Sequence, residues 1–126
     1  MTVVLDASAL LVLLHDEPGA ASVVPLLEGA AVSAVNWSEV VQKAATRGVD
    51  MTGLRDDVET LGVHIVIFDA DSAEATADLW TITRNAGLSL GDRACLALAR
   101  ALGATAVTAD KAWAEINAGV AVQLLR

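Results

Sequence analysis

The chain is poor in the residues that build zinc sites, disulfides and membrane spans. Its 126 residues include one cysteine, two histidines, one phenylalanine, two prolines and no tyrosine. A single cysteine excludes an intramolecular disulfide, and His15 and His64 lack the spacing that would join Cys95 in a zinc site. We therefore expect Cys95 to be a small buried side chain. Every apolar run is far shorter than the roughly 18 residues that cross a bilayer, so we expect no membrane helix.

Basic residues are also scarce. The chain has 8 Lys and Arg against 16 Asp and Glu, a formal net charge of −8. This charge argues against the basic footprint of nucleic-acid binding, although bound divalent cations would reverse it locally. An acidic surface also suits a basic protein partner. No positive charge precedes the apolar segment Ala7–Leu14, as it would in a signal peptide, so we expect a cytoplasmic protein.

Length and hydrophobic patterning predict a single α/β domain over residues 1–126. Strands are expected at Val3–Leu5, Ala31–Val32, His64–Phe68, Ala104–Thr108 and Val120–Leu124. Helices are expected at Ser8–His15, Ala20–Glu28, Asn36–Thr46, after Asp50 or Thr52, from Asp71 or Ser72 to Asn85, at Ser89–Ala101 and at Lys111–Glu115. This alternation predicts a three-layer α/β/α sandwich with a central, mainly parallel sheet.

Four acidic residues are the main functional candidates: Asp6, Glu39, Asp92 and Asp110. Asp6 and Asp110 follow expected strands and would lie at the carboxyl edge of the sheet, where α/β proteins bind ligands. Carboxylates gathered without a cationic side chain raise one another's pKa or require a cation. Oxygen ligands without histidine or cysteine suit Mg²⁺ or Mn²⁺.

Each acid also has a local structural explanation. Asp6 and Asp110 could serve only as helix N-caps, and Asp92 lies in a first helical turn, where the helix dipole favours a carboxylate. Glu39 could form a capping box with Asn36. The acids taken singly therefore leave capping and catalysis open.

The sequence around these acids resembles the PIN-domain family over essentially its whole length. The resemblance lies in four segments in the family's order: Val3-Val4-Leu5-Asp6-Ala7-Ser8, Asn36-Trp37-Ser38-Glu39, Ser89-Leu90-Gly91-Asp92-Arg93 and Val107-Thr108-Ala109-Asp110. Among PIN domains, the compact length looks most like a VapC-type toxin of a bacterial type II toxin–antitoxin pair.

That resemblance implies a Mg²⁺- or Mn²⁺-dependent endoribonuclease, commonly a homodimer, which a cognate VapB-type antitoxin inhibits. It also implies that Asp6, Glu39, Asp92 and Asp110 form the catalytic, metal-binding site, with Asp6 and Asp92 as the leading ligands. Ser8, Asn36 and Thr108 would support these carboxylates. Ser8 and Thr108 are equally explained by local turns or caps. Whether one or two metal ions bind stays open.

Four basic residues are candidates for RNA contact: Lys43, Arg47, Arg93 and Lys111. Lys43 and Arg47 lie four residues apart on the helix face of Glu39, and they could guide a phosphate backbone. Lys43 could equally pair with Glu39 at i, i+4. For Arg93 and Lys111, a plain surface position is the simpler expectation. The three tryptophans are expected mainly in the core.

Two other functions fit the same acids. The first is a catalytically silent, PIN-like acidic module that binds a basic protein. The second is a metal-dependent phosphohydrolase, which also places Asp at a strand end. The second fits less well, because Asp6-Ala7-Ser8 lacks the second Asp of its nucleophile motif.

Overall fold

The computed structural model describes residues 2–126. The five strands are β1 (Val3–Leu5), β2 (Ala31–Ser33), β3 (His64–Val66), β4 (Thr105–Thr108) and β5 (Val122–Leu124). The α-helices are α1 (Ala7–Leu14), α2 (Ala20–Val23), α3 (Ala34–Thr46), α4 (Leu54–Thr60), α5 (Ala70–Asp78), α6 (Trp80–Thr83) and α7 (Leu90–Leu102). Short 3-10 helices cover Val24–Leu26 (η1), Arg84–Ala86 (η2) and Lys111–Glu115 (η3).

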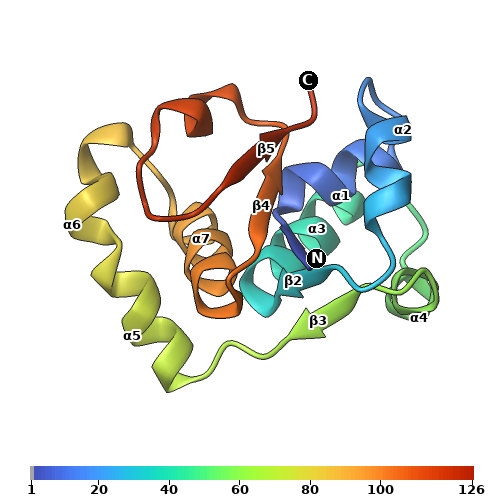
Figure 1. Cartoon of the computed structure of the whole chain (residues 1–126). Helices are drawn as coiled ribbons and strands as arrows, with labels where there is room; N and C mark the ends of the chain where they lie inside the picture. The colour runs from blue at the N-terminus through green and yellow to red at the C-terminus, as the bar shows by residue number, and fades with distance from the viewer. Residues whose placement is uncertain (1) are drawn as a thin grey trace.

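The strands form one sheet in the order β3-β2-β1-β4-β5, and every neighbouring pair is parallel. Helices α1 to α4 lie on one side of it and α5 to α7 on the other (Figure 1). This arrangement confirms the predicted three-layer fold with a parallel central sheet. None of the helices within residues 2–126 has the length and apolar character needed to cross a membrane.

Alternating side chains of the short central strands fill two separate cores. Leu5, Val32 and Val107 face the core beneath α1 and α3, whereas Val4, Ala31 and Ala106 face the core beneath α7. This period of two is the pattern of strands that are buried on both faces. The apolar residues of α1 lie in this first core, where they are buried or packed against the cluster.

The order in which strands are added to the sheet reverses at its middle, at β1. From β1 the chain moves outward to β2 and β3, and it then crosses to β4 on the other side of β1. The crevice beyond the carboxyl ends of β1 and β4 is therefore the topological switch point, where open α/β sheets bind ligands. Asp6 directly follows β1, and Thr108 is the last residue of β4.

Two expected helix boundaries are wrong for physical reasons. Helix α3 begins at Ala34 with Ser33 as its N-cap, so the expected capping box of Asn36 and Glu39 does not form. The helix expected up to Asn85 breaks at Leu79. On both sides of this break a threonine hydroxyl donates to the carbonyl four residues earlier: Thr76 to Ser72 and Thr83 to Leu79. Such bonds compete with the helical ladder and bend helices.

The tryptophans do not share one environment. Trp113 is fully buried and Trp37 packs against the first core, as expected. The expectation is wrong for Trp80, which is 51% exposed and stacks with the guanidinium of Arg84 at 5.4 Å from the ring centroid. A guanidinium placed over an exposed indole ring is a favourable cation–π contact.

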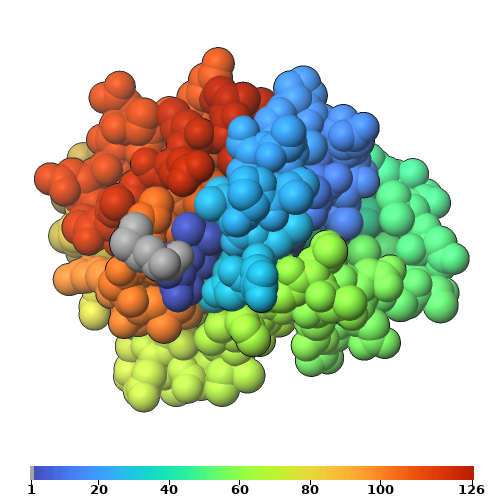
Figure 2. All heavy atoms as spheres, turned by 45° about the vertical axis from the view of Figure 1, so that its right-hand side comes forward, coloured from blue at the N-terminus to red at the C-terminus, as the bar shows by residue number. Residues whose placement is uncertain are grey.

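The C-terminal residues pack against the segment that follows α1. Arg126 donates to the Pro18 carbonyl at 3.1 Å and contacts the Glu17 carboxylate at 3.4 Å. Gly19 has a φ of 104° and lies against the Leu125 backbone, where a side chain would be both strained and crowded. Figure 2 shows this contact on the surface as red atoms of the C-terminal segment beside the blue atoms of the early chain.

Candidate active site

Asp6 is a buried carboxylate held by three donors. It is only 4% exposed, and its Oδ1 accepts from the Ala9 amide at 2.8 Å and the Ser8 hydroxyl at 2.7 Å. Its Oδ2 accepts from the Thr108 hydroxyl at 2.5 Å. Burial raises the pKa of Asp6 from its ordinary value of 3.8, and the three hydrogen bonds oppose that shift. The side chain is the N-cap of α1, as its sequence position allowed. Capping needs only the hydrogen bond from Ala9, and it explains neither the burial nor the two hydroxyl donors.

Ser8 and Thr108 join the two central strands at the site. The Thr108 hydroxyl accepts from the Asp110 amide at 3.0 Å, and the Ser8 hydroxyl accepts from the Ala109 amide at 2.9 Å. Both hydroxyls therefore link the segment after β4 to the Asp6 carboxylate. These bonds fix the orientation of Asp6 with groups about 100 residues away in the chain.

Glu39 is held in place by Asn36 and by the backbone of α7. The buried Asn36 amide donates to Glu39 Oε1 at 3.0 Å and to the Gly91 carbonyl at 3.0 Å. The Glu39 carboxylate lies so close to Gly91 that a Cβ there would collide with it, the carboxyl carbon being 2.8 Å from the position of that atom. A glycine at this helix position thus makes room for the acid.

Asp92 opens α7 through a capping box. Its Oδ2 accepts from the Ser89 amide at 3.0 Å, and the Ser89 hydroxyl accepts from the Asp92 amide at 3.2 Å. Its Oδ1 accepts no hydrogen bond from residues 2–126, so it is available to a ligand. The Asp92 charge also contributes to the raised pKa of Asp6, although less than burial does.

The buried thiol of Cys95 lies in α7, the helix that Asp92 opens. Burial raises its pKa well above the usual range. The charges of Asp6, Asp92 and Glu39 raise the pKa further, although less than burial does. They come from the segment after β1, from α3 and from the start of α7.

Asp110 is placed differently from the other three acids. It is exposed and caps η3, with Oδ1 accepting from the Ala112 amide at 3.0 Å. It reaches the site through its backbone amide, which donates to Thr108.

The carboxylates fit a hard cation that keeps some of its water ligands better than one that is ligated by protein oxygens alone. Within the part of the chain that the structure describes, no three Asp, Glu, His or Cys side chains are grouped so that they could hold a metal ion. Oxygen donors alone nevertheless match the preference of Mg²⁺, which retains several water ligands. The free oxygens Asp92 Oδ1 and Glu39 Oε2 could contact such an ion directly or through water.

The four basic candidates divide into two groups. Lys43 and Arg47 line a polar cavity that also includes Ser8, and Lys43 forms no ion pair with Glu39 in residues 2–126. The other two lie elsewhere: Arg93 reaches the Thr76 carbonyl at 3.4 Å and Lys111 is exposed in η3.

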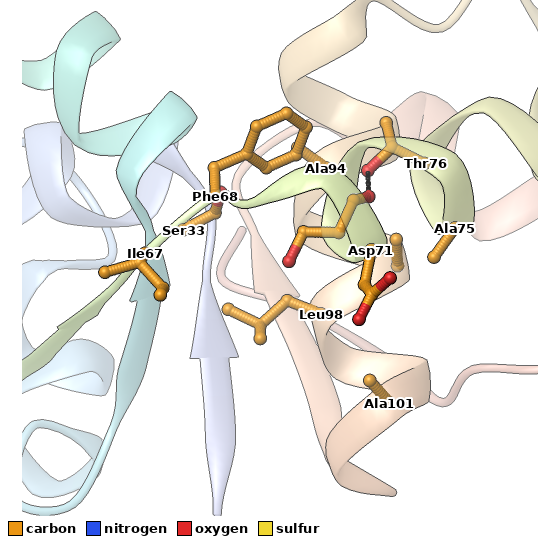
Figure 3. A pocket seen from close by; sticks show the side chains of 11 residues that line it. Ser33, Ile67, Phe68, Asp71, Ala75, Thr76, Ala94, Leu98 and Ala101 are labelled. Carbon is orange, nitrogen blue, oxygen red and sulfur yellow. Dashed lines mark hydrogen bonds between the residues drawn. The ribbon is translucent and has the colours of Figure 1, made fainter.

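A second cavity, between α5 and α7, is mainly apolar. Its volume is about 290 Å³, and Asp71 is the one ionisable residue that lines it. Figure 3 shows the aromatic and aliphatic side chains of Phe68 and Leu98 around it. No cationic side chain lines it, so it is not suited to a phosphate, and none of the four candidate acids lines it.

Sequence reasoning missed Gly91 and the polar groups around Arg126. A glycine in a helical pattern is a signal for close approach, and this signal was present in Leu90-Gly91-Asp92. No local signal joins residue 126 to residues 15–18, because that contact depends on the completed fold.

Comparisons with known proteins point to one family. A family model described as PIN domain matches residues 3–119. A toxin–antitoxin complex from Klebsiella pneumoniae has a similar structure, with a TM-score of 0.77, 23% identity and coverage of 98% of each chain. FitAcB from Neisseria gonorrhoeae aligns with a TM-score of 0.75 at 22% identity, covering 98% of this chain and 97% of its own.

A third similar structure is VapC20 of Mycobacterium tuberculosis, described as a sarcin–ricin loop cleaving toxin. It aligns with a TM-score of 0.69 at 16% identity, over 91% of this chain and 96% of its own. Identities this low establish similarity of fold. No curated protein matches the sequence.

Proposed function

Since the chain belongs to the PIN-domain family, we propose that it is a Mg²⁺- or Mn²⁺-dependent endoribonuclease that acts as the toxin of a VapBC-type pair. The observation that carries this proposal lies beyond the carboxyl ends of β1 and β4: the buried Asp6 is held by Ser8 and Thr108, and Glu39 is held against Gly91, next to Asp92 at the start of α7. Similar structures include toxin–antitoxin complexes and a toxin that cleaves the sarcin–ricin loop.

Asp6, Asp92 and Glu39 would hold the metal ion, and Asp110 would complete the site through water. A bound Mg²⁺ or Mn²⁺ supplies charge neutralisation and a more acidic water. Asp6 is oriented by Ser8 and Thr108, so its oxygens stay fixed as charge develops. Glu39 is held by Asn36 through Oε1, which leaves Oε2 to accept a proton from water.

The expected reaction is hydrolysis of an RNA phosphodiester. The water oxygen bonds to phosphorus, the bond from phosphorus to the 3′ oxygen breaks, and the 3′ oxygen takes a proton. The products are a 3′-hydroxyl and a 5′-phosphate. The alternative route, in which the 2′-hydroxyl attacks and a 2′,3′-cyclic phosphate forms, commonly uses a pair of histidines, and the acidic site contains none. Identifying the ends of the RNA products distinguishes the two routes.

The test is RNA cleavage by the purified protein with Mg²⁺ or Mn²⁺ and with a chelator. We expect cleavage with metal only, and a loss of at least about 100-fold in Asp6→Asn and Asp92→Asn. Asp71→Asn is the matched control, because it removes the same charge from the apolar cavity. Equal cleavage by the Asp6 and Asp92 variants, with folding verified by circular dichroism, would refute the nuclease assignment.

The biological role is tested separately. We propose that the protein is cytoplasmic and homodimeric, and that a VapB-type antitoxin encoded beside it inhibits it. Expression in bacteria should arrest growth, coexpression of the neighbouring small protein should restore it, and Asp6→Asn should be harmless. Growth arrest that persists in Asp6→Asn would separate toxicity from the acidic site.

One observation favours the alternative of a silent acidic binding module. The carboxylates within residues 2–126 do not form a closed metal cage. Such a module would bind its partner without metal and cleave no RNA. The cleavage assay with and without metal therefore distinguishes the two functions.

A further inference from the structure

The polar cavity lined by Lys43 and Arg47 lies beside the acidic site. It has a volume of about 400 Å³ and is lined by residues of α1, α3, the segment after α1 and the C-terminus. Ser8 lines this cavity and also donates to Asp6. The Ser8 end of the cavity therefore lies next to Asp6. We call this cavity the cationic pocket.

The cationic pocket concentrates positive charge in an acidic protein. Three of the chain's eight Lys and Arg residues line it: Lys43, Arg47 and Arg126. Glu17 is its one acidic lining residue, so three positive charges and one negative charge leave the pocket at +2. The whole chain carries −8. The fold thus supplies a local basic surface that the composition does not show.

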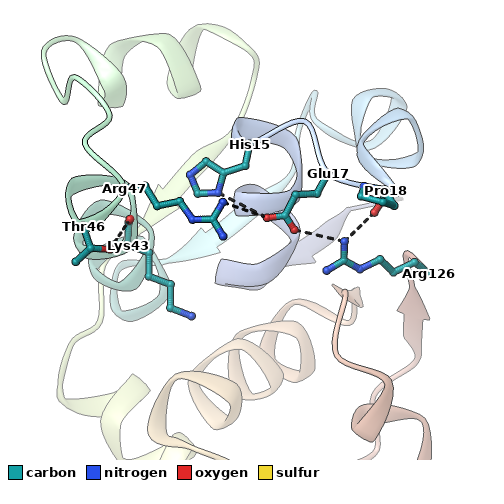
Figure 4. A network of polar contacts seen from close by, with 7 residues as sticks. All are labelled: His15, Glu17, Pro18, Lys43, Thr46, Arg47 and Arg126. Carbon is teal, nitrogen blue, oxygen red and sulfur yellow. Dashed lines mark hydrogen bonds and ion pairs between the residues drawn. The ribbon is translucent and has the colours of Figure 1, made fainter.

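Glu17 already occupies the position of an anion in the pocket. Its Oε1 lies 3.6 Å from the Arg47 guanidinium and 3.8 Å from His15 Nδ1. Its Oε2 lies 3.4 Å from Arg126. Figure 4 shows these side chains converging on the carboxylate from three parts of the chain. Guanidinium groups arranged around a carboxylate also match the oxygens of a phosphate.

His15 provides an independent sign of a missing ligand. Its side chain is only 9% exposed, and it lines the same pocket. Both ring nitrogens are buried and have no hydrogen-bond partner among the described residues. A buried polar group without a partner destabilises the folded protein, so an acceptor that enters the pocket relieves this cost.

We propose that the cationic pocket binds an RNA backbone phosphate that neighbours the phosphate being cleaved. This proposal rests on the nuclease function above and names the substrate contact of the same site. The incoming phosphate takes over the donors of His15, Arg47 and Arg126, and the partly exposed Glu17 turns toward solvent. Lys43 adds charge at the rim. Ser8 then connects the bound strand to the acidic site.

The first test uses the fact that the chain has only two histidines. The ring signals of His15 and His64 are followed by NMR while a 2′-O-methyl RNA oligomer is added in the presence of a chelator, which removes the metal ion that cleavage requires. We expect the His15 signal to shift and the signal of His64, exposed on β3, to stay unchanged. A titration that leaves His15 unaffected, or shifts both equally, overturns the proposal.

The second test compares single charge removals. Arg47→Gln and Arg126→Gln should each weaken binding of the same oligomer by about tenfold, as expected for a hydrogen bond to a charged group. Each should also lower the slope of log affinity against log salt by about 0.7. Arg55→Gln, which breaks an exposed pair with Glu59, is the matched control and should change neither value.

The outcomes separate this proposal from the nuclease assignment. If the parent protein cleaves RNA and the Arg47 and Arg126 variants bind and cleave like it, the pocket proposal fails and the nuclease stands. If His15 responds to RNA but the parent cleaves nothing with either metal, the pocket stands and the nuclease fails. Loss of antitoxin binding with unchanged RNA binding in these variants would make the pocket a protein contact and overturn the proposal.

Discussion

The acidic site and the cationic pocket share Ser8 but are built in opposite ways. The acidic site gathers like charges, and each carboxylate is fixed by a separate donor: Thr108 for Asp6, Asn36 for Glu39 and Ser89 for Asp92. The cationic pocket gathers opposite charges around one acceptor, Glu17, at distances of 3.4–3.8 Å. In the acidic site, hydrogen bonds hold the carboxylates in place against their mutual repulsion. In the cationic pocket, attraction between opposite charges holds the side chains together.

This difference suggests a division of labour. Rigid orientation matters where a transition state is stabilised, because misplacement by about 1 Å costs about 100-fold in rate. Looser ion pairs suit a surface that must exchange its own carboxylate for a phosphate. Changes to the acidic site should therefore alter kcat, and changes to the cationic pocket should alter KM.

The largest effect is expected from Gly91→Ala. The new methyl group would displace the Glu39 carboxylate, which is the flexible end of a side chain, so the backbone need not move. We expect kcat to fall by about 100-fold. The free energy of unfolding should change by less than about 1 kcal/mol. Single-turnover cleavage and urea unfolding measure the two effects.

Leu90→Ala is the control for Gly91→Ala, since this neighbouring side chain is exposed. Its kcat should match that of the parent. An unchanged kcat in Gly91→Ala would show that Glu39 tolerates displacement, and the acidic site would then be no more rigid than the pocket.

Salt should act on the pocket rather than on the acidic site. The one phosphate bound in the pocket predicts a slope of about −0.7 in log affinity against log salt for single strands. Raising NaCl from about 50 to 200 mM should then raise KM by about 2.5-fold and leave kcat nearly constant. Steady-state cleavage at several salt concentrations tests this. A salt effect confined to kcat would contradict the proposed division.

Thr108→Val should weaken the acidic site by removing the donor to Asp6 Oδ2. An unpaired buried acceptor lowers the free energy of unfolding by about 1–3 kcal/mol. The Thr108 hydrogen bond lowers the pKa of Asp6, so its loss raises that pKa. The acidic limb of the cleavage pH profile should therefore move to higher pH. Thr105→Val on the same strand is the control, and an equal shift there would remove Thr108 from this role.

The smallest effect concerns the pH dependence of stability. Burial raises the pKa of Asp6 above 3.8, so its proton is held more tightly in the folded than in the unfolded chain. This stabilisation is complete below the unfolded pKa and is lost as pH rises through the folded pKa. We expect the free energy of unfolding of the parent, measured with urea and a chelator, to decline as the pH rises above about 4, and we expect no such decline in Asp6→Asn. An identical decline in both proteins would assign it to another group.

The sequence was informative where a local motif coincided with the fold. Asp6 and Asp92 were recognisable because each follows a strand or opens a helix, and both remain N-terminal helix residues in the structure. The parallel sheet followed from the alternation of segments, since crossover connections leave few other arrangements.

Long-range contacts set the limit of that reasoning. The capping box considered as one alternative for Asn36 and Glu39 does not form because Ser33 starts the helix earlier, and Asn36 instead bridges Glu39 to α7. Arg126 was not considered for RNA contact, since its ion pair with Glu17 spans 109 positions of the chain. Such contacts depend on how β5 packs against the early segments, which no local pattern encodes.

The hydrogen bond from Thr108 to Asp6 spans 102 positions and joins the end of β4 to the residue that follows β1. During translation, the Asp6 carboxylate therefore has no Thr108 or Ala109 beside it until β4 has left the ribosome. An unfinished chain carries Asp6 and Glu39 but not the strand that orients the first of them. The proposed nuclease site therefore lacks this support in the nascent polypeptide until synthesis is nearly complete.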